Sequence, residues 1–313
     1  MLILERNETW KRRENPIRRV VLRHIPEPGT QRLMLEKGDV DLAASLDPSD
    51  LDAIEENPST WLKRTPTFRT IYMAFNQETP AFADPRVIEA MHYLIDYEAI
   101  AKTVLNKAAI VRESPVPLGM FGALPESYTP YALNIDKARD LLREAGVAEG
   151  FTFELLSSNS TPYSDIAQHF QQNLLRAGVE AKIITLSSGH LFTKVRARNF
   201  QAYIGGYGFN YPDANNVMLR FGYNPKSSED NSVSVAWRTG WDPGEWFNAT
   251  VMQAQTEPDP LKREQLYHEL QRYHMENAPI IFLFQRLGVN ALSRNVESIK
   301  ANAITLSYAS AVK

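Results

Sequence analysis

The most regular pattern of apolar and polar positions lies between residues 136 and 206. Short apolar runs there alternate with stretches whose apolar residues recur at helical spacing. This order predicts strand, helix, strand, helix and strand, and such units almost always form a parallel sheet with one handedness. We expect the three strands at 151–156, 179–186 and 201–204. Asp136 and Ser164 have the residue types that cap helix N-termini, so we expect the first two helices to begin there.

The pattern predicts further elements on both sides of this region. Strands are expected at 17–25, 39–43, 70–76, 279–284 and 288–292. Helices are expected at 31–36, 49–56, 97–105, 189–198 and 260–277, with one more beginning after Asp84. Residues 112–131 contain four prolines and no periodicity. A segment of that length inside a domain usually has a function or wraps a surface.

The segment 205–216 stands out because it reads Gly-Gly-Tyr-Gly-Phe-Asn-Tyr-Pro-Asp-Ala-Asn-Asn and follows the last of these strands. In open parallel sheets, ligands bind beyond the carboxyl ends of the strands. Aromatic faces beside a few polar groups are typical of a small-molecule site. The alternative is a turn whose tyrosines belong to the core and whose Asn and Asp cap local backbone. The candidate ligand-binding residues are Tyr207, Asn210, Tyr211, Asp213, Asn216 and, from a later Trp-rich section, Trp237.

Composition and charge narrow the classes of partner. The net charge is −3 and the pI is near 6.1, which argues against general attraction to nucleic acid. The basic residues between 11 and 24 are therefore read as a solvated surface, although a nucleic-acid patch is the competing interpretation. The sequence has no cysteine, no run long enough to cross a membrane and no apolar N-terminal stretch of signal-peptide length.

Motifs of catalysis, metal binding and cofactor binding are not apparent. His268 and His274 are too far apart for the H-E-x-x-H zinc motif. Asp39 and Asp41 lie on one face of a predicted strand, but no third ligand is near, so a structural role is favoured. The glycines at 205–208 have no helix N-terminus after them in this interpretation, which argues against a nucleotide site. We expect no metal, no cofactor and no catalysis. The alternative is an α/β enzyme with its cleft at 205–216.

Several stretches, in this order, resemble the bacterial family 5 extracellular solute-binding proteins, the peptide, nickel and oligosaccharide receptors of ABC importers. They are Leu4-Glu5-Arg6-Asn7, Leu35-Glu36-Lys37-Gly38-Asp39-Val40-Asp41, Phe82-Ala83-Asp84-Pro85-Arg86-Val87, Leu141-Leu142-Arg143-Glu144-Ala145-Gly146, Leu174-Leu175-Arg176-Ala177-Gly178-Val179 and Ala278-Pro279-Ile280-Ile281. Each piece is short, but their order and spacing together are specific.

The resemblance implies an α/β fold of the type II periplasmic-binding-protein kind, with a C-terminal lobe and part of lobe I. It implies that residues 1–69 and 281–313 belong to lobe I and residues 70–280 form lobe III, the ligand-binding lobe. It also implies a parent protein in the periplasm, with a small-molecule solute and a membrane permease as partners. Family members have further chain before the point matched by Met1. We therefore expect an exposed apolar patch on the lobe I part and weak solute binding by this chain alone.

The segment 205–216 resembles the family pattern Trp-Gly-x-Asp-Tyr-Pro-Asp-Pro. Tyr207 stands at the Trp position, and Asn210 stands at the first Asp, which takes the ligand's α-ammonium in peptide receptors. An amide carries no charge with which to balance a buried ammonium. Asp213 is kept, but its neighbours suggest a turn in which it bonds backbone amides. The sequence therefore predicts a ligand rich in hydroxyl or amide groups rather than a free-amine peptide.

Overall fold

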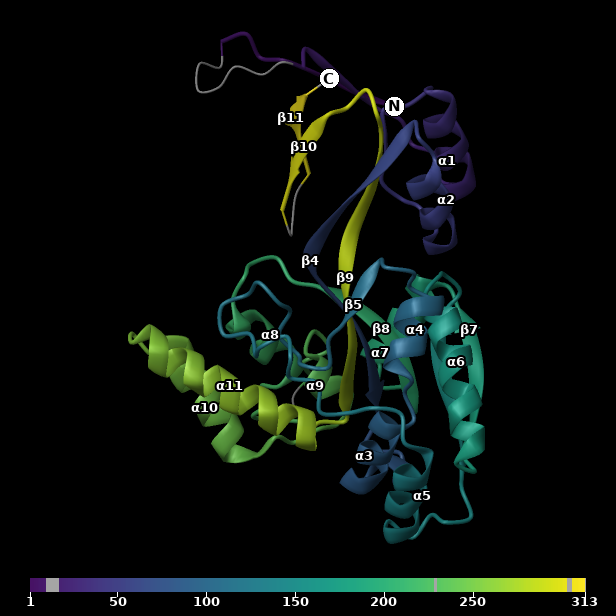
Figure 1. Ribbon diagram of the computed structural model, residues 1–313. Coiled ribbons are helices and arrows are strands. Elements are labelled where there is room, and N and C mark those ends of the chain that lie inside the picture. Colours follow the sequence, from purple (N-terminus) through teal and green to yellow (C-terminus); the bar gives the residue numbers. More distant parts are fainter. Residues whose placement is uncertain (10–16, 228–229, 303–305, 313) are drawn as a thin grey trace. The chain divides into compact units, whose positions relative to one another are not determined.

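The computed structural model describes residues 1–9, 17–227, 230–302 and 306–312. The chain forms two compact units (Figure 1). The smaller unit contains residues 1–67, 106–108 and 287–313, and the larger unit contains residues 68–105 and 109–286. Two long strands contribute residues to both units. The lobe boundaries expected near 69–70 and 280–281 stay a prediction, since they concern a longer protein.

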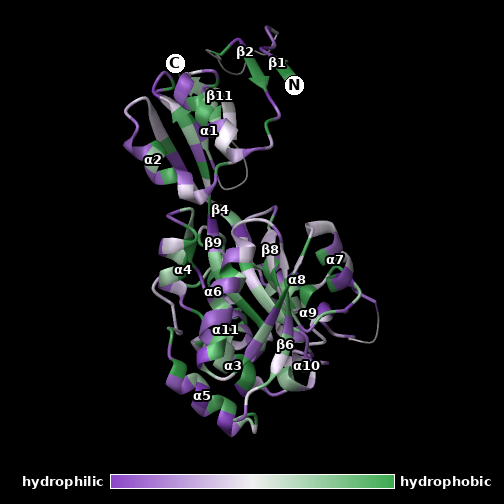
Figure 2. Ribbon diagram, turned by 90° about the vertical axis from the view of Figure 1, so that its right-hand side faces the viewer, coloured by the Kyte–Doolittle hydropathy of each residue, from purple (hydrophilic) through white to green (hydrophobic). Residues whose placement is uncertain are grey.

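The described residues of the smaller unit form short strands and short helices. Its elements are β1 (Leu2–Glu5), β2 (Arg19–Leu22), α1 (Pro28–Lys37), β3 (Leu42–Ala43), η1 (Pro48–Asp50), α2 (Leu51–Glu56), the start of β4 (Thr60–Phe75), the end of β9 (Ile280–Ser293), β10 (Ser298–Ala301) and β11 (Leu306–Val312). Strands β1 and β2 pair antiparallel and are largely hydrophobic in Figure 2. Leu2, Ile3, Leu4 and Val21 are 43% or more exposed, so the expected apolar patch is present.

The larger unit is an α/β sandwich. Its elements are the remainder of β4 and β9 with η2 (Pro80–Phe82), α3 (Pro85–Tyr93), α4 (Tyr97–Thr103), β5 (Ala109–Val111), α5 (Ile135–Glu144), β6 (Thr152–Ser158), α6 (Tyr163–Arg176), β7 (Glu180–Leu186), α7 (Ser188–Arg196), β8 (Ala202–Gly208), α8 (Ala214–Phe221), α9 (Val235–Arg238), α10 (Gly244–Thr256) and α11 (Pro260–Asn277).

The predicted parallel unit is confirmed. Strand β6 pairs in parallel with β7 on one side and with β8 on the other. Strand β8 then pairs antiparallel with β4, and β4 is followed across the sheet by β9. The carboxyl ends of β6, β7 and β8 therefore lie along one edge of the sheet.

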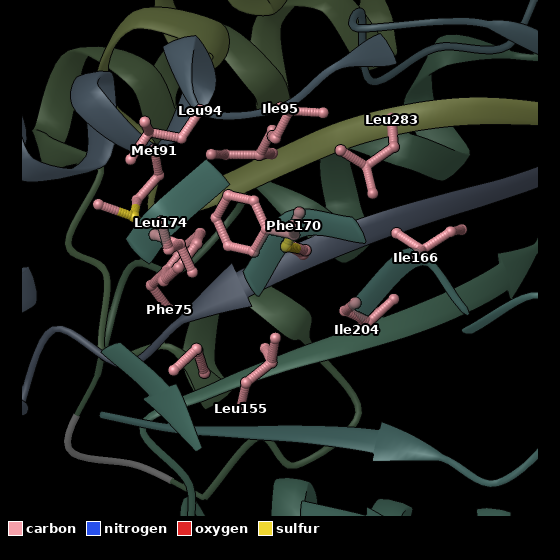
Figure 3. Packing of buried hydrophobic residues seen from close by; sticks show 14 of the residues in the cluster. Phe75, Met91, Leu94, Ile95, Leu155, Ile166, Phe170, Leu174, Ile204 and Leu283 are labelled. Atoms are coloured by element: carbon pink, nitrogen blue, oxygen red, sulfur yellow. The ribbon is translucent and has the colours of Figure 1, made fainter. Parts of the chain in front are cut away.

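Helices cover both faces of this sheet (Figure 1). The alternation along β4 shows how: Ile71, Met73 and Phe75 belong to a core shared with α3 to α6, whereas Tyr72 packs against Phe221 of α8. Figure 3 shows the first core, where Phe170 of α6 lies among side chains from the helices and the strands. Burial of these apolar side chains is the main term that stabilises the unit.

Several predicted elements have different bounds in the structure. Strand β4 begins at Thr60 rather than at residue 70, because its first half is polar and gives no apolar pattern. Strand β9 is continuous to Ser293 and joins the two strands expected at 279–284 and 288–292. The strand expected at 39–43 is reduced to two residues, Leu42–Ala43.

Two predicted N-caps are wrong, and the segment 205–216 is not one loop. Helix α5 is capped by Asn134, whose side chain accepts a hydrogen bond from Lys137 N, and not by Asp136. Helix α6 begins at Tyr163, so Ser164 lies inside it. Residues 205–208 belong to strand β8 and residues 214–216 to helix α8. The expectation that no helix N-terminus follows the glycines was therefore also wrong.

The core predicts a large effect of one truncation. Phe170 is fully buried, so Phe170→Ala should lower the free energy of unfolding by about 3–5 kcal/mol through lost burial and a cavity. Leu175 on the same helix is 58% exposed, and Leu175→Ala should change it by less than about 1 kcal/mol. Urea denaturation of the two variants measures both values. Similar losses in the two variants would contradict the packing described.

Candidate functional site

Strand β8 ends in an aromatic group that continues into the segment before α8. The ring of Tyr207 lies 5.0 Å from that of Phe209 and 5.4 Å from that of Phe221, centre to centre. Phe209 is buried, so it anchors the chain where β8 ends. The guanidinium of Arg220 lies 5.6 Å from the centre of the Tyr207 ring. Tyr207 is half-buried and keeps part of its ring accessible.

Asp213 is held by two sets of hydrogen bonds. Its Oδ1 accepts a hydrogen bond of 2.9 Å from the backbone N of Asn215 and so caps the N-terminus of α8. The sequence predicted that Asp213 bonds backbone amides in this way, although in a turn rather than at a helix. Both carboxylate oxygens also accept hydrogen bonds of 2.8 Å from the guanidinium of Arg263 on α11. This bidentate geometry is the strongest that the two groups can form. Asp213 is therefore fully engaged within the protein.

The environment of Arg263 strengthens this pair. Hydrogen bonding to Asp213 is the largest of the effects that raise the pKa of Arg263, so the guanidinium stays charged. Its charge lies over the rings of Phe121, at 4.8 Å, and Tyr267, at 5.0 Å. Burial raises the pKa of Tyr267 to about 12, and its hydroxyl accepts a hydrogen bond from Arg263 at 3.2 Å.

The proline-rich segment 112–131 wraps this region. Phe121 N donates to the carbonyl of Pro212, and Ala214 N donates to the carbonyl of Phe121, each at 3.0 Å. Gln271 of α11 holds the same segment, since its amide donates to the carbonyl of Gly122 at 2.6 Å. The segment thus fixes the backbone on both sides of Asp213, as a long irregular segment with a structural task is expected to do.

Asn210 and Asn216 form a pair of side-chain amides. The amide NH₂ of Asn216 donates to Oδ1 of Asn210 at 3.1 Å and to the carbonyl of Tyr211 at 3.3 Å. The carbonyl oxygen of Asn210 is therefore already engaged. The pair leaves two groups for a solute: the NH₂ of the exposed Asn210, which is a hydrogen-bond donor, and Oδ1 of the half-buried Asn216, which is an uncharged acceptor.

The structure brings five of the six candidate residues together and separates the sixth. Tyr211 is 41% exposed beside Asn210. Trp237 instead stacks on the guanidinium of Arg198, at 3.9 Å, and Arg198 lies a few residues before Ala202, where β8 begins. Tyr207 lies at the other end of the strand, so Trp237 is not part of the same cluster. Three tryptophans close together in the sequence suggested an aromatic site. Their spacing did not indicate that Trp237 packs near the start of β8, whereas Tyr207 lies near its end.

Residues that sequence reasoning missed supply most of the fixed charge. Arg263 lies 50 positions from Asp213 and on an amphipathic helix where an arginine gives no signal by itself. Phe121 lies in a segment without periodicity. Arg69 faces Gly208 across the β4–β8 register, which only the pairing of the two strands reveals.

A second polar group is buried within the wrapping segment and against α3. Glu113 is 2% exposed, and its carboxylate accepts a hydrogen bond from Tyr131 N at 3.0 Å. Burial raises the pKa of Glu113 to about 7. His92 stacks on Tyr131 at 4.0 Å, and burial lowers its pKa to about 3. His274 is fully buried too, with its pKa lowered to about 4 by burial. Both histidines are therefore neutral at neutral pH, whereas Glu113 titrates there, so the three groups do not form a charged acid–base pair.

Other features of the described residues lie outside the segment 205–216. A cavity of about 1090 Å³ in the smaller unit is lined mainly by β2, the segment 39–45 and apolar side chains such as Leu292 and Val296. Among the described residues, no three His, Asp or Glu side chains come together to hold a metal ion. Within the same residues, no helix is both long and apolar enough to cross a membrane.

Known proteins resemble this chain over most of its length. Residues 1–229 match the model of the bacterial extracellular solute-binding proteins, family 5 Middle. The chain is 24% identical over 283 residues to a glutathione-binding protein of Shigella flexneri serotype 5b, covering 88% of this chain and 54% of that protein. The chain thus spans about half the length of the curated relatives it matches.

Two solved structures show the fold. HbpA2 from Haemophilus parasuis superposes with a TM-score of 0.84 at 23% identity, covering 99% of this chain and 61% of that one. The periplasmic binding protein DppA from Helicobacter pylori, in complex with the peptide STSA, gives 0.83 at 21% identity, covering 97% and 58%. The fold is that of the type II periplasmic binding proteins, as the sequence predicted.

The buried carboxyl of Glu113 predicts a pH dependence of stability. Its pKa is about 7 in the folded chain against an ordinary 4.5, so the folded state binds the proton more tightly. Its contribution is present below pH 4.5 and is lost as the pH rises through 7. Glu113→Gln, which stays neutral, should gain roughly 2–3 kcal/mol relative to the wild type between pH 4.5 and 8.5.

Urea denaturation of the wild type and of Glu113→Gln at several pH values measures this difference. The buried histidines cancel, because both proteins contain them. An exposed carboxylate provides the control, and Glu149→Gln should give a difference that does not change with pH by more than a few tenths of a kcal/mol. A constant difference for Glu113→Gln as well would contradict the raised pKa.

Proposed function

Because this chain belongs to the bacterial extracellular solute-binding proteins of family 5, we propose that it is part of the solute-binding component of an ABC importer. A small solute would be held at the carboxyl edge of the parallel strands, by Tyr207, Asn210, Tyr211 and Asn216. Several of the matched relatives are named as binding proteins, which supports a role without catalysis. The periplasm and a membrane permease are the location and partner that this role implies.

The observation that carries the choice of solute is the state of Asp213. Its carboxylate is the only one in the segment 205–216, and both oxygens are bound to Arg263. A buried ammonium needs a negatively charged partner, because otherwise no interaction offsets the free energy of hydration that it loses. This segment offers an amide NH₂ on Asn210 and the ring faces of Tyr207 and Tyr211 instead. Hydroxyl and amide groups on a solute match these donors and faces better than a free amine does.

Native mass spectrometry tests the proposed function directly. The chain, purified without refolding, is electrosprayed under conditions that preserve complexes, and any co-purified molecule is weighed and fragmented. We expect a small solute with several hydroxyl or amide groups, and titration calorimetry of that compound should show saturable binding. Binding of a free-amine peptide in preference to such solutes would contradict the proposed class. Turnover of the bound compound would contradict the non-catalytic role.

One substitution should change the preferred class. Asn210→Asp places a carboxylate where a ligand ammonium could lie, and a charge-assisted hydrogen bond of this kind contributes about 1.5–3 kcal/mol. Binding of free-amine dipeptides should therefore tighten by roughly 10- to 100-fold, while binding of neutral sugars weakens or stays the same. Calorimetry against one panel of dipeptides and one of sugars measures both effects.

Asn199→Asp provides the matched control, because Asn199 is exposed and lies before the first residue of β8. It adds the same charge away from Asn210 and should leave both panels unchanged. If the wild type already binds free-amine dipeptides tightly and Asn210→Asp has no effect, position 210 does not set the ligand class.

A further inference from the structure

Two glycines leave one face of β8 without side chains near its carboxyl end. Gly206 and Gly208 alternate with Tyr207 along the strand. Side chains at these two positions would therefore point to the face opposite the Tyr207 ring. A Cβ on Gly206 would overlap the hydroxyl oxygen of Tyr163 on α6. A Cβ on Gly208 would lie 3.5 Å from Cγ and 3.8 Å from Nε of Arg69. The bare strip is thus flanked by a phenol and a guanidinium.

These two flanking groups are available to a ligand. Arg69 is exposed, and its register partner on β8 is Gly208, which offers it no side chain. Within the part of the chain that the structure describes, neither the guanidinium of Arg69 nor the hydroxyl of Tyr163 has an ion-pair or hydrogen-bond partner. Arg263 presents the opposite case, since Asp213 neutralises it. The charge of Arg69 therefore remains uncompensated beside a bare stretch of backbone.

We propose that this strip is a subsite for a carboxylate group of the solute, bound by Arg69 and Tyr163. Gly206 and Gly208 lie roughly 7 Å apart along the strand. An arginine side chain is long enough to reach across this distance, so Arg69 and Tyr163 can contact the same carboxylate. The planar fork of a guanidinium matches a carboxylate with two parallel hydrogen bonds, and a phenol supplies a third donor. This inference rests on the proposed function and specifies the class of its solute.

The rest of the edge indicates what the carboxylate is attached to. Two exposed serines, Ser160 after β6 and Ser188 at the start of α7, place hydroxyl groups beyond the carboxyl ends of the neighbouring strands, and both bond to Oγ of the buried Ser158, at 2.9 and 3.1 Å. Serine hydroxyls both donate and accept, so they match sugar-like hydroxyl groups. Together with the Asn210 amide, they favour a hydroxylated carboxylic acid. A single arginine suits one negative charge better than a phosphate dianion.

Nuclear magnetic resonance titration tests this subsite even when binding is weak. The ¹⁵N-labelled chain is titrated with sodium gluconate, a hydroxylated carboxylate, and separately with sorbitol, its neutral counterpart, and with sodium phosphate, all at constant ionic strength. The side-chain Nε–Hε signal of Arg69 is assigned by its loss in Arg69→Gln. We expect gluconate to shift this signal saturably and to bind at least 10-fold more tightly than sorbitol.

Variants separate the carboxylate contact from general charge effects. Arg69→Gln should weaken gluconate binding by 10-fold or more and leave sorbitol binding unchanged. Tyr163→Phe should weaken it several-fold. Arg196→Gln removes an exposed charge from α7 and should change nothing. The melting temperature of each variant shows whether it is folded.

Three results would overturn the subsite: no shift of the Arg69 signal, equal binding of gluconate by Arg69→Gln and the wild type, or a larger shift with phosphate than with gluconate. These outcomes differ from failure of the proposed function. A neutral solute that binds without moving the Arg69 signal refutes the subsite and leaves solute binding intact. A gluconate-dependent Arg69 shift in a chain that turns over its bound compound refutes the binding-protein role and leaves the subsite intact.

Discussion

The bidentate pair between Asp213 and Arg263 is the contact on which the candidate site depends. It joins the start of α8 to α11, and the segment around Phe121 closes over it through two backbone hydrogen bonds. Partly buried pairs of this geometry are stabilising when their remaining hydrogen bonds are satisfied, and here Asn215 N and the hydroxyl of Tyr267 satisfy them. Because the pair engages the carboxylate of the segment, it also sets the chemistry that remains for a solute.

Glycines in β8 supply the second constraint. A side chain at Gly205 would lie 2.8 Å from the ring of Tyr203, and one at Gly206 would overlap Tyr163. Their absence lets aromatic residues from α6 and β4 approach the strand closely. The same absence exposes backbone at the edge where parallel strands end. The same glycines that let the core pack closely therefore also leave the backbone of Gly208 exposed beside Arg69.

Local patterns in the sequence predicted the parallel unit, the position of the segment 205–216 after its last strand and the bonding of Asp213 to backbone amides, because each depends on residues close together in the chain. The helix that Asp213 caps was not predicted. Contacts between distant segments were not predictable in this way. Arg263, Phe121 and Arg69 reach the site through helix packing and strand register, which no periodicity encodes. The separation of Trp237 from Tyr207 was not predictable either, because it follows from the packing of Trp237 on Arg198 before β8.

A double-mutant cycle on Asp213 and Arg263 tests the central claim most directly. The free energy of unfolding is measured by urea denaturation for the wild type, Asp213→Asn, Arg263→Gln and the double variant. If the pair is formed as described, each single change costs nearly as much as the double change, and the coupling energy is roughly 1–3 kcal/mol. Additive effects, with a coupling below about 0.5 kcal/mol, would show that Asp213 is not committed to Arg263 and is free to receive a ligand.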